Sequence, residues 1–82
     1  MAELINKKAG DSLWLLNERS NYPRVTDLHI HQYSQGGVTG LTLTMTYKGH
    51  KEHLELDVYA TVSDFRSTAN YMYGKMIQKY GD

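Results

Sequence analysis

The segment Leu41-Thr-Leu-Thr-Met-Thr-Tyr47 and the segment His53-Leu-Glu-Leu-Asp-Val-Tyr59, which follows it after a short turn, decide the fold of this chain. Apolar and polar residues alternate along both segments. A period of two is typical of β-strands that turn one face to a core and the other to solvent. We therefore predict two antiparallel strands whose shared polar face is free to make contacts.

A third strand precedes these two. Apolar and polar residues alternate again over residues 28–33, and the pair Gly36-Gly37 follows. Two adjacent glycines accept the positive φ angles of a two-residue hairpin loop. A loop at this pair sets Ile30 opposite Leu43, so the apolar side chains of both strands share one face.

The second turn is interpreted in the same way. A two-residue loop at Gly49-His50 sets Met45 opposite Leu54 on the apolar face. On the polar face this register predicts two rows across the three strands, His29–Thr44–Glu55 and His31–Thr42–Asp57.

Two helices flank the strands. Asp11 or Ser12 can cap a short helix that runs to about Arg19. Its predicted buried residues are Leu13, Leu16 and Trp14. Because four apolar residues in a row also fit a buried strand, the type of this element stays open between helix and strand.

The second helix is predicted from Asp64 to about Tyr80, with Ser63 as its N-cap and Gly81 as its stop signal. Apolar residues at helical spacing predict its buried face, which consists of Phe65, Ala69, Met72 and Met76. The whole pattern predicts an α+β fold in the order α-β-β-β-α. A three-stranded antiparallel meander is covered on one face by both helices. Residues 1–10 are predicted to be a flexible N-terminal arm, and residues 11–82 a single domain.

Composition and charge exclude several classes of function. The 82 residues carry nine basic and nine acidic side chains, so no net charge draws the chain to nucleic acid or anionic lipid. The absence of cysteine excludes disulfides, thiolate metal sites and cysteine catalysis. The first residues lack the order of a signal peptide, and no apolar run is long enough to span a membrane. We expect a cytoplasmic, soluble protein.

The polar face of the sheet supplies the candidate site. The residues expected to bind a partner are His29, His31, Tyr33, Thr42, Thr44, Glu55, Asp57 and Tyr59. Histidines two residues apart on a strand can hold a divalent metal if a third ligand lies close, but Glu55 and Asp57 are expected two strands away. No nucleophile with an orienting partner and no phosphate-binding loop is present. We therefore expect no enzyme activity, no metal and no cofactor.

The stretch Leu15-Leu16-Asn17-Glu18 and the α-β-β-β-α order resemble the double-stranded-RNA-binding domain over roughly residues 12–80. That resemblance implies RNA binding through lysines at the start of the last helix. Here that position reads Ser63-Asp64-Phe65-Arg66-Ser67, and the first hairpin loop is shorter than the family's. If RNA is the ligand, the candidate phosphate contacts are Lys48, Lys51, Arg66 and Lys75.

A protein partner is the alternative that balanced charge favours. The predicted edge strands, residues 28–33 and 53–60, contain no proline, so either can pair with another strand, including that of a second copy in a homodimer. Small size, neutral charge and the absence of catalytic groups also fit a regulatory accessory protein of a phage or mobile element. We predict a binding protein of this kind, with RNA binding as the alternative.

Overall fold

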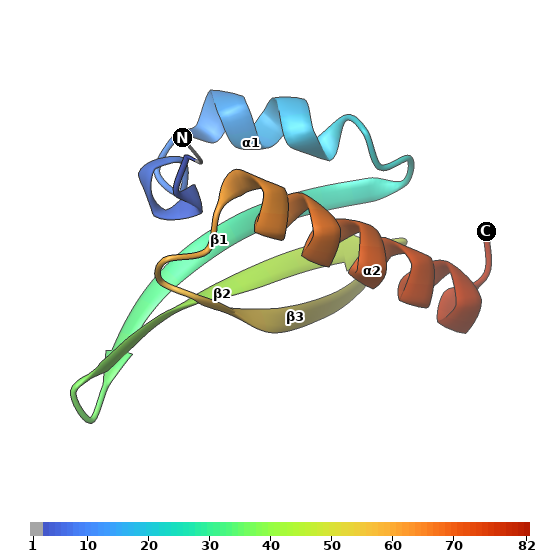
Figure 1. The fold of residues 1–82 in the computed structure, drawn as a ribbon. Helices are drawn as coiled ribbons and strands as arrows, with labels where there is room; N and C mark the ends of the chain where they lie inside the picture. Colours follow the sequence, from blue (N-terminus) through green and yellow to red (C-terminus); the bar gives the residue numbers. More distant parts are fainter. Residues whose placement is uncertain (1–2) are drawn as a thin grey trace.

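A computed structural model describes residues 3–82 and shows the predicted α+β architecture (Figure 1). The elements are a 3-10 turn η1 (Ile5–Lys7), helix α1 (Ser12–Arg19), strands β1 (Val25–Gln35), β2 (Val38–Tyr47) and β3 (His50–Asp57), and helix α2 (Val62–Tyr80). The strands form one antiparallel sheet in the order β1-β2-β3. Both helices lie on the same face of this sheet, as predicted.

The first hairpin has the predicted register. Gly36 and Gly37 have φ angles of 58° and 80°, which only a residue without a side chain adopts easily. They form a two-residue loop that pairs Ile30 with Leu43. The strands are longer than predicted, and the tip of the hairpin projects beyond both helices (Figure 1).

The second hairpin differs from the prediction: its loop begins one residue earlier, and the pairing of β2 with β3 shifts by two residues. Its loop is Lys48-Gly49, with φ angles of 51° and 84°, rather than Gly49-His50. Glycine takes the second position of the loop, as in Asn-Gly turns, where both central residues have positive φ. The strand pairs are therefore Met45 with Glu52, Thr44 with His53, Leu43 with Leu54, Thr42 with Glu55, and Gly40 with Asp57. The predicted rows that paired Thr44 with Glu55 and Thr42 with Asp57 are wrong.

Helix α1 forms at the predicted position, but with another face toward the core. Asp11 caps it by accepting a hydrogen bond from the Trp14 amide at 3.1 Å. Leu13 and Leu16, predicted to be buried, are 74% and 50% exposed. Leu15 and Glu18 are buried instead.

An ion pair between the helices fixes this orientation. The Glu18 carboxylate accepts hydrogen bonds from Nε and Nη2 of Arg66 on α2, at 3.0 and 3.2 Å. A two-pronged contact between guanidinium and carboxylate sets both position and angle. It holds one side of α1 toward α2 and leaves the Leu13 side in solvent.

Helix α2 buries the four residues predicted to face the sheet, Phe65, Ala69, Met72 and Met76. It begins two residues earlier than predicted. Its N-cap is Thr61 rather than Ser63, because Thr61 and Asp64 form a reciprocal capping box. Gly81 ends the helix as expected.

The N-terminal segment belongs to the domain. Ile5 is completely buried, its amide donates to the Ala60 carbonyl at 2.8 Å, and the Val62 amide donates to the Glu3 carbonyl at 2.8 Å. The prediction of a flexible arm is therefore wrong for residues 3–10, while residues 1–2 of that arm lie outside the described residues. The core behind the sheet contains Ile5, Leu15, Tyr22, Val25, Leu28, Ile30, Leu41, Leu43, Met45, Tyr47, Ala60, Phe65, Ala69, Met72 and Met76.

Candidate functional site

The face of the sheet opposite the helices is the candidate site. No element of the described part of the chain crosses this face (Figure 1). Side chains alternate along a strand, so burial of Leu28 and Ile30 against the helices turns His29 and His31 outward. We call this surface the open face. The registers place four rows on it, namely Asp27–Thr46–Lys51, His29–Thr44–His53, His31–Thr42–Glu55 and Tyr33–Gly40–Asp57.

His29 and Asp27 form a fixed pair on the open face. Nδ1 of His29 lies 2.8 Å from Oδ2 of Asp27, and both side chains are about half exposed. A carboxylate at this distance holds the imidazole ring in one orientation and favours a proton on Nδ1. Sequence analysis missed Asp27 because it began the strand at Leu28, although the two-residue spacing to His29 was a usable signal.

His53 is the second residue that sequence analysis left out of the site. The corrected register puts it across Thr44 from His29, so that three histidines share the open face. Thr44, which lies between His29 and His53 in this row, is buried although it is on the solvent side of the sheet.

A second group of contacts organises the other end of the open face. A side chain on Gly40 would collide with Tyr33, because a Cβ atom there would lie 2.5 Å from the Tyr33 hydroxyl. The Tyr33 ring therefore crosses Gly40 and reaches toward β3. Its hydrogen bond to the Glu55 carboxylate raises the pKa of Tyr33 above its usual value. Thr42 also donates to Glu55, at 3.3 Å to Oε2.

Tyr59 and Asp57 lie at the edge of the site. Tyr59 is 75% exposed in the turn after β3, outside the strand ladder. Its amide donates to Oδ1 of Asp57 at 2.7 Å, so this carboxylate also stabilises the turn. The eight residues predicted to bind a partner thus fall into the open face, apart from Tyr59 beside it.

The four basic residues considered for RNA lie on separate surfaces. Lys51 is on the open face, whereas Arg66 and Lys75 belong to α2 on the other side of the sheet. Arg66 is engaged by Glu18, and Lys48 donates to the carbonyl of Asp82 beyond the C-terminal end of α2. Arg66 lies near the start of α2, and Lys48 lies beside its C-terminal end. Because an α-helix rises about 1.5 Å per residue, the two are roughly 20 Å apart in the direction of α2.

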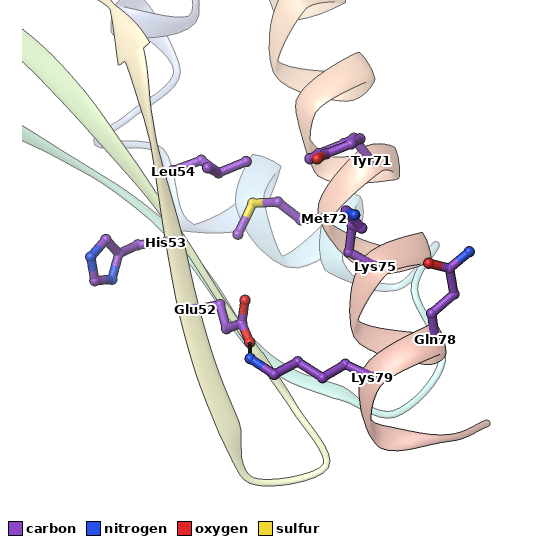
Figure 2. Close-up of a pocket in the computed structure, with 8 residues that line it drawn as sticks. All are labelled: Glu52, His53, Leu54, Tyr71, Met72, Lys75, Gln78 and Lys79. Carbon is purple, nitrogen blue, oxygen red and sulfur yellow. Dashed lines mark hydrogen bonds and ion pairs between the residues drawn. The ribbon is translucent and has the colours of Figure 1, made fainter.

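The open face presents carboxylates, imidazoles, threonine hydroxyls and one ammonium group. Within residues 3–82, no three His, Asp or Glu side chains come together in an arrangement that could hold a metal ion. The Asp27–His29 pair could transfer a proton, but it sits on a flat sheet rather than in a cavity. A groove of about 430 Å³ lies elsewhere, between β3 and α2 (Figure 2).

Comparisons of this chain with protein-family models, with curated proteins and with solved structures found no significant match. Among residues 3–82, no helix has both the length and the apolar content that are needed to cross a membrane.

Proposed function

We propose that this chain is a non-enzymatic binding protein that recognises another protein through the open face. The observation that carries the proposal is the uncovered face itself. Its polar side chains stand on the sheet and are held in place by Asp27–His29 and by the contacts of Tyr33 and Thr42 with Glu55. Side chains that are ordered before binding lose less conformational entropy on binding. The small size and balanced charge fit a regulatory accessory protein of a phage or mobile element.

The charges of the open face indicate the chemistry of the partner. The face carries three carboxylates, Asp27, Glu55 and Asp57, against one ammonium group, Lys51. Complementary potentials steer association and suppress wrong partners. We therefore expect a partner that presents lysine or arginine, and we expect the same carboxylates to repel RNA phosphates from this face.

The test is a pull-down from cell lysate with matched variants, each in nuclease-treated and untreated halves. His31→Lys adds a positive charge to the open face, where His31 is exposed. Gln32→Lys adds the same charge to the next residue of the same strand, which turns to the other face and is also exposed. The two variants therefore add the same charge to the same strand and differ in the face of the sheet that carries it.

We expect one protein to survive nuclease treatment with the wild type and with Gln32→Lys, and to fall at least ~10-fold with His31→Lys. Equal recovery of that protein by His31→Lys would overturn the proposal. Recovery of RNA, with loss of the co-purifying proteins after nuclease, would instead support the RNA-binding alternative.

A further inference from the structure

A second surface of the molecule is the outer edge of β3. This strand pairs with β2 on one side, and on its other side no strand follows in the described part of the chain. An open edge of this kind is a template for strand addition. The groove of about 430 Å³ runs alongside it, with Leu54 and Met72 toward its floor and Tyr71 and Lys75 on its α2 wall (Figure 2). Leu54 is 37% exposed there.

The charges along β3 are complementary about Leu54. Lys51 and Asp57 lie three residues before and after it, and His53 and Glu55 lie one residue before and after it. All four turn to the open face, while Leu54 turns to the groove, as Figure 2 shows for Leu54 and His53. An antiparallel strand of the same sequence would therefore place the Lys51 ammonium group opposite the Asp57 carboxylate and the His53 imidazole opposite the Glu55 carboxylate.

We propose that a second copy of this chain adds its β3 to this edge, antiparallel, with the two-fold axis at Leu54. The result is a continuous six-stranded sheet with both open faces on one side and all helices on the other. Lys51 of each copy then lies opposite Asp57 of the other, and His53 opposite Glu55. Opposite charges in directly facing positions stabilise a strand pair, and like charges destabilise it.

The hydrogen-bond pattern of β3 agrees with this register. Tyr47 and His50 flank the two-residue loop and form the first bonded pair of the β2–β3 ladder. Bonded and non-bonded pairs alternate in an antiparallel ladder, so odd-numbered residues 51–57 turn their N–H and C=O groups to the free edge. In the proposed register those residues face one another. The two Leu54 residues form a non-bonded pair, in which the Cα atoms are about 4.5 Å apart and the side chains touch.

Other registers and the other edge are less favourable. An axis at His53 sets Lys51 opposite Glu55, but it places the two His53 rings opposite each other and leaves Asp57 without a facing cation. An axis at Glu55 sets two carboxylates opposite each other. On the β1 edge, an axis at Ile30 sets His29 opposite His31 and creates no pair of opposite charges. Of these registers, the axis at Leu54 is the one in which both Asp57 and Glu55 face a basic side chain.

The test is the oligomeric state, measured by sedimentation from about 1 to 300 µM. A single added strand pair makes a small interface, and small interfaces predict association in the micromolar range. We expect the mass to rise with concentration toward twice the monomer mass of 9.4 kDa. A chain that stays monomeric at about 300 µM would overturn the proposal.

Charge exchange tests the register. Lys51→Glu and Asp57→Lys should each raise the dissociation constant at least ~10-fold, because each sets like charges opposite each other. The double variant Lys51→Glu/Asp57→Lys should return to within ~3-fold of the wild type. Single variants that weaken association without recovery in the double variant would refute the axis at Leu54.

Two further variants separate folding from association. Asp57 also accepts a hydrogen bond from the Tyr59 amide, so Asp57→Asn removes the charge and keeps this acceptor. It should weaken the dimer while the melting temperature of the monomer is unchanged. Lys7→Glu makes the same charge change on the exposed surface of η1 and should leave association unchanged. The open face need not bind a partner for this dimer to form, so either proposal can fail alone.

Discussion

Replacing Gly74 with alanine should stabilise this protein. Gly74 lies inside α2 with helical backbone angles, and a Cβ atom built there meets nothing within 4 Å. The substitution therefore costs no packing and no strain. Glycine in a helix interior is about 1 kcal/mol less favourable than alanine, because it loses more backbone entropy on folding. For a domain of this size, about 1 kcal/mol raises the melting temperature by about 4–8 °C.

The assay is thermal and urea unfolding followed by circular dichroism at low protein concentration. Gly40→Ala is the matched control, because the same change at Gly40 puts Cβ within 2.7 Å of the Tyr33 ring. It displaces Tyr33 from Glu55, so we expect no gain in stability or a loss. An unchanged or lower midpoint for Gly74→Ala, or an equal gain at Gly40, would refute the reasoning.

The remaining predictions concern the core, the helix pair and a carboxylate. Ile5→Ala should cost about 2–4 kcal/mol in urea unfolding, as for a core residue, whereas a free arm would show no change. Arg66→Met should lower the melting temperature by more than ~5 °C, because it leaves the buried Glu18 carboxylate unpaired, and adding Glu18→Met should recover part of this loss. The Tyr80 hydroxyl lowers the pKa of Glu52 below its ordinary value of 4.5. This contribution to stability is present above pH 4.5 and is lost as pH falls through the lower folded pKa, so Glu52→Gln should flatten the pH dependence of unfolding in that range.

Local patterns predicted the elements whose structure depends on nearby residues. The alternation over 41–47 and 53–59, the Gly36-Gly37 loop and the apolar spacing of α2 each reflect contacts with a period of two or of 3.6 residues. The alternation over 41–47, the Gly36-Gly37 loop and the spacing of α2 were confirmed by the register of β1 with β2 and by the buried face of α2, whereas the strand predicted over 53–60 lies at His50–Asp57, with Val58 and Tyr59 in a turn. The sheet and its helical cover follow from these signals.

Long-range contacts decided the features that the sequence did not predict. The orientation of α1 is set by Glu18 and Arg66, which are 48 residues apart. An eight-residue helix with four consecutive apolar residues offers several apolar faces, and no local signal selects the one that carries Leu15. The position of residues 3–7 likewise depends on the bond between the Ile5 amide and the Ala60 carbonyl. Nothing in residues 1–10 encodes that partner.

The candidate site shows how one loop residue changes a surface. Moving the second loop from Gly49-His50 to Lys48-Gly49 shifts the pairing by two residues, so every side chain keeps its face and takes new neighbours. The shift brings His53 across Thr44 from His29 and moves Glu55 from Thr44 to Thr42, across from His31. The sequence thus predicted which residues lie on the open face, whereas the φ angle of Lys48 determined which of them are adjacent.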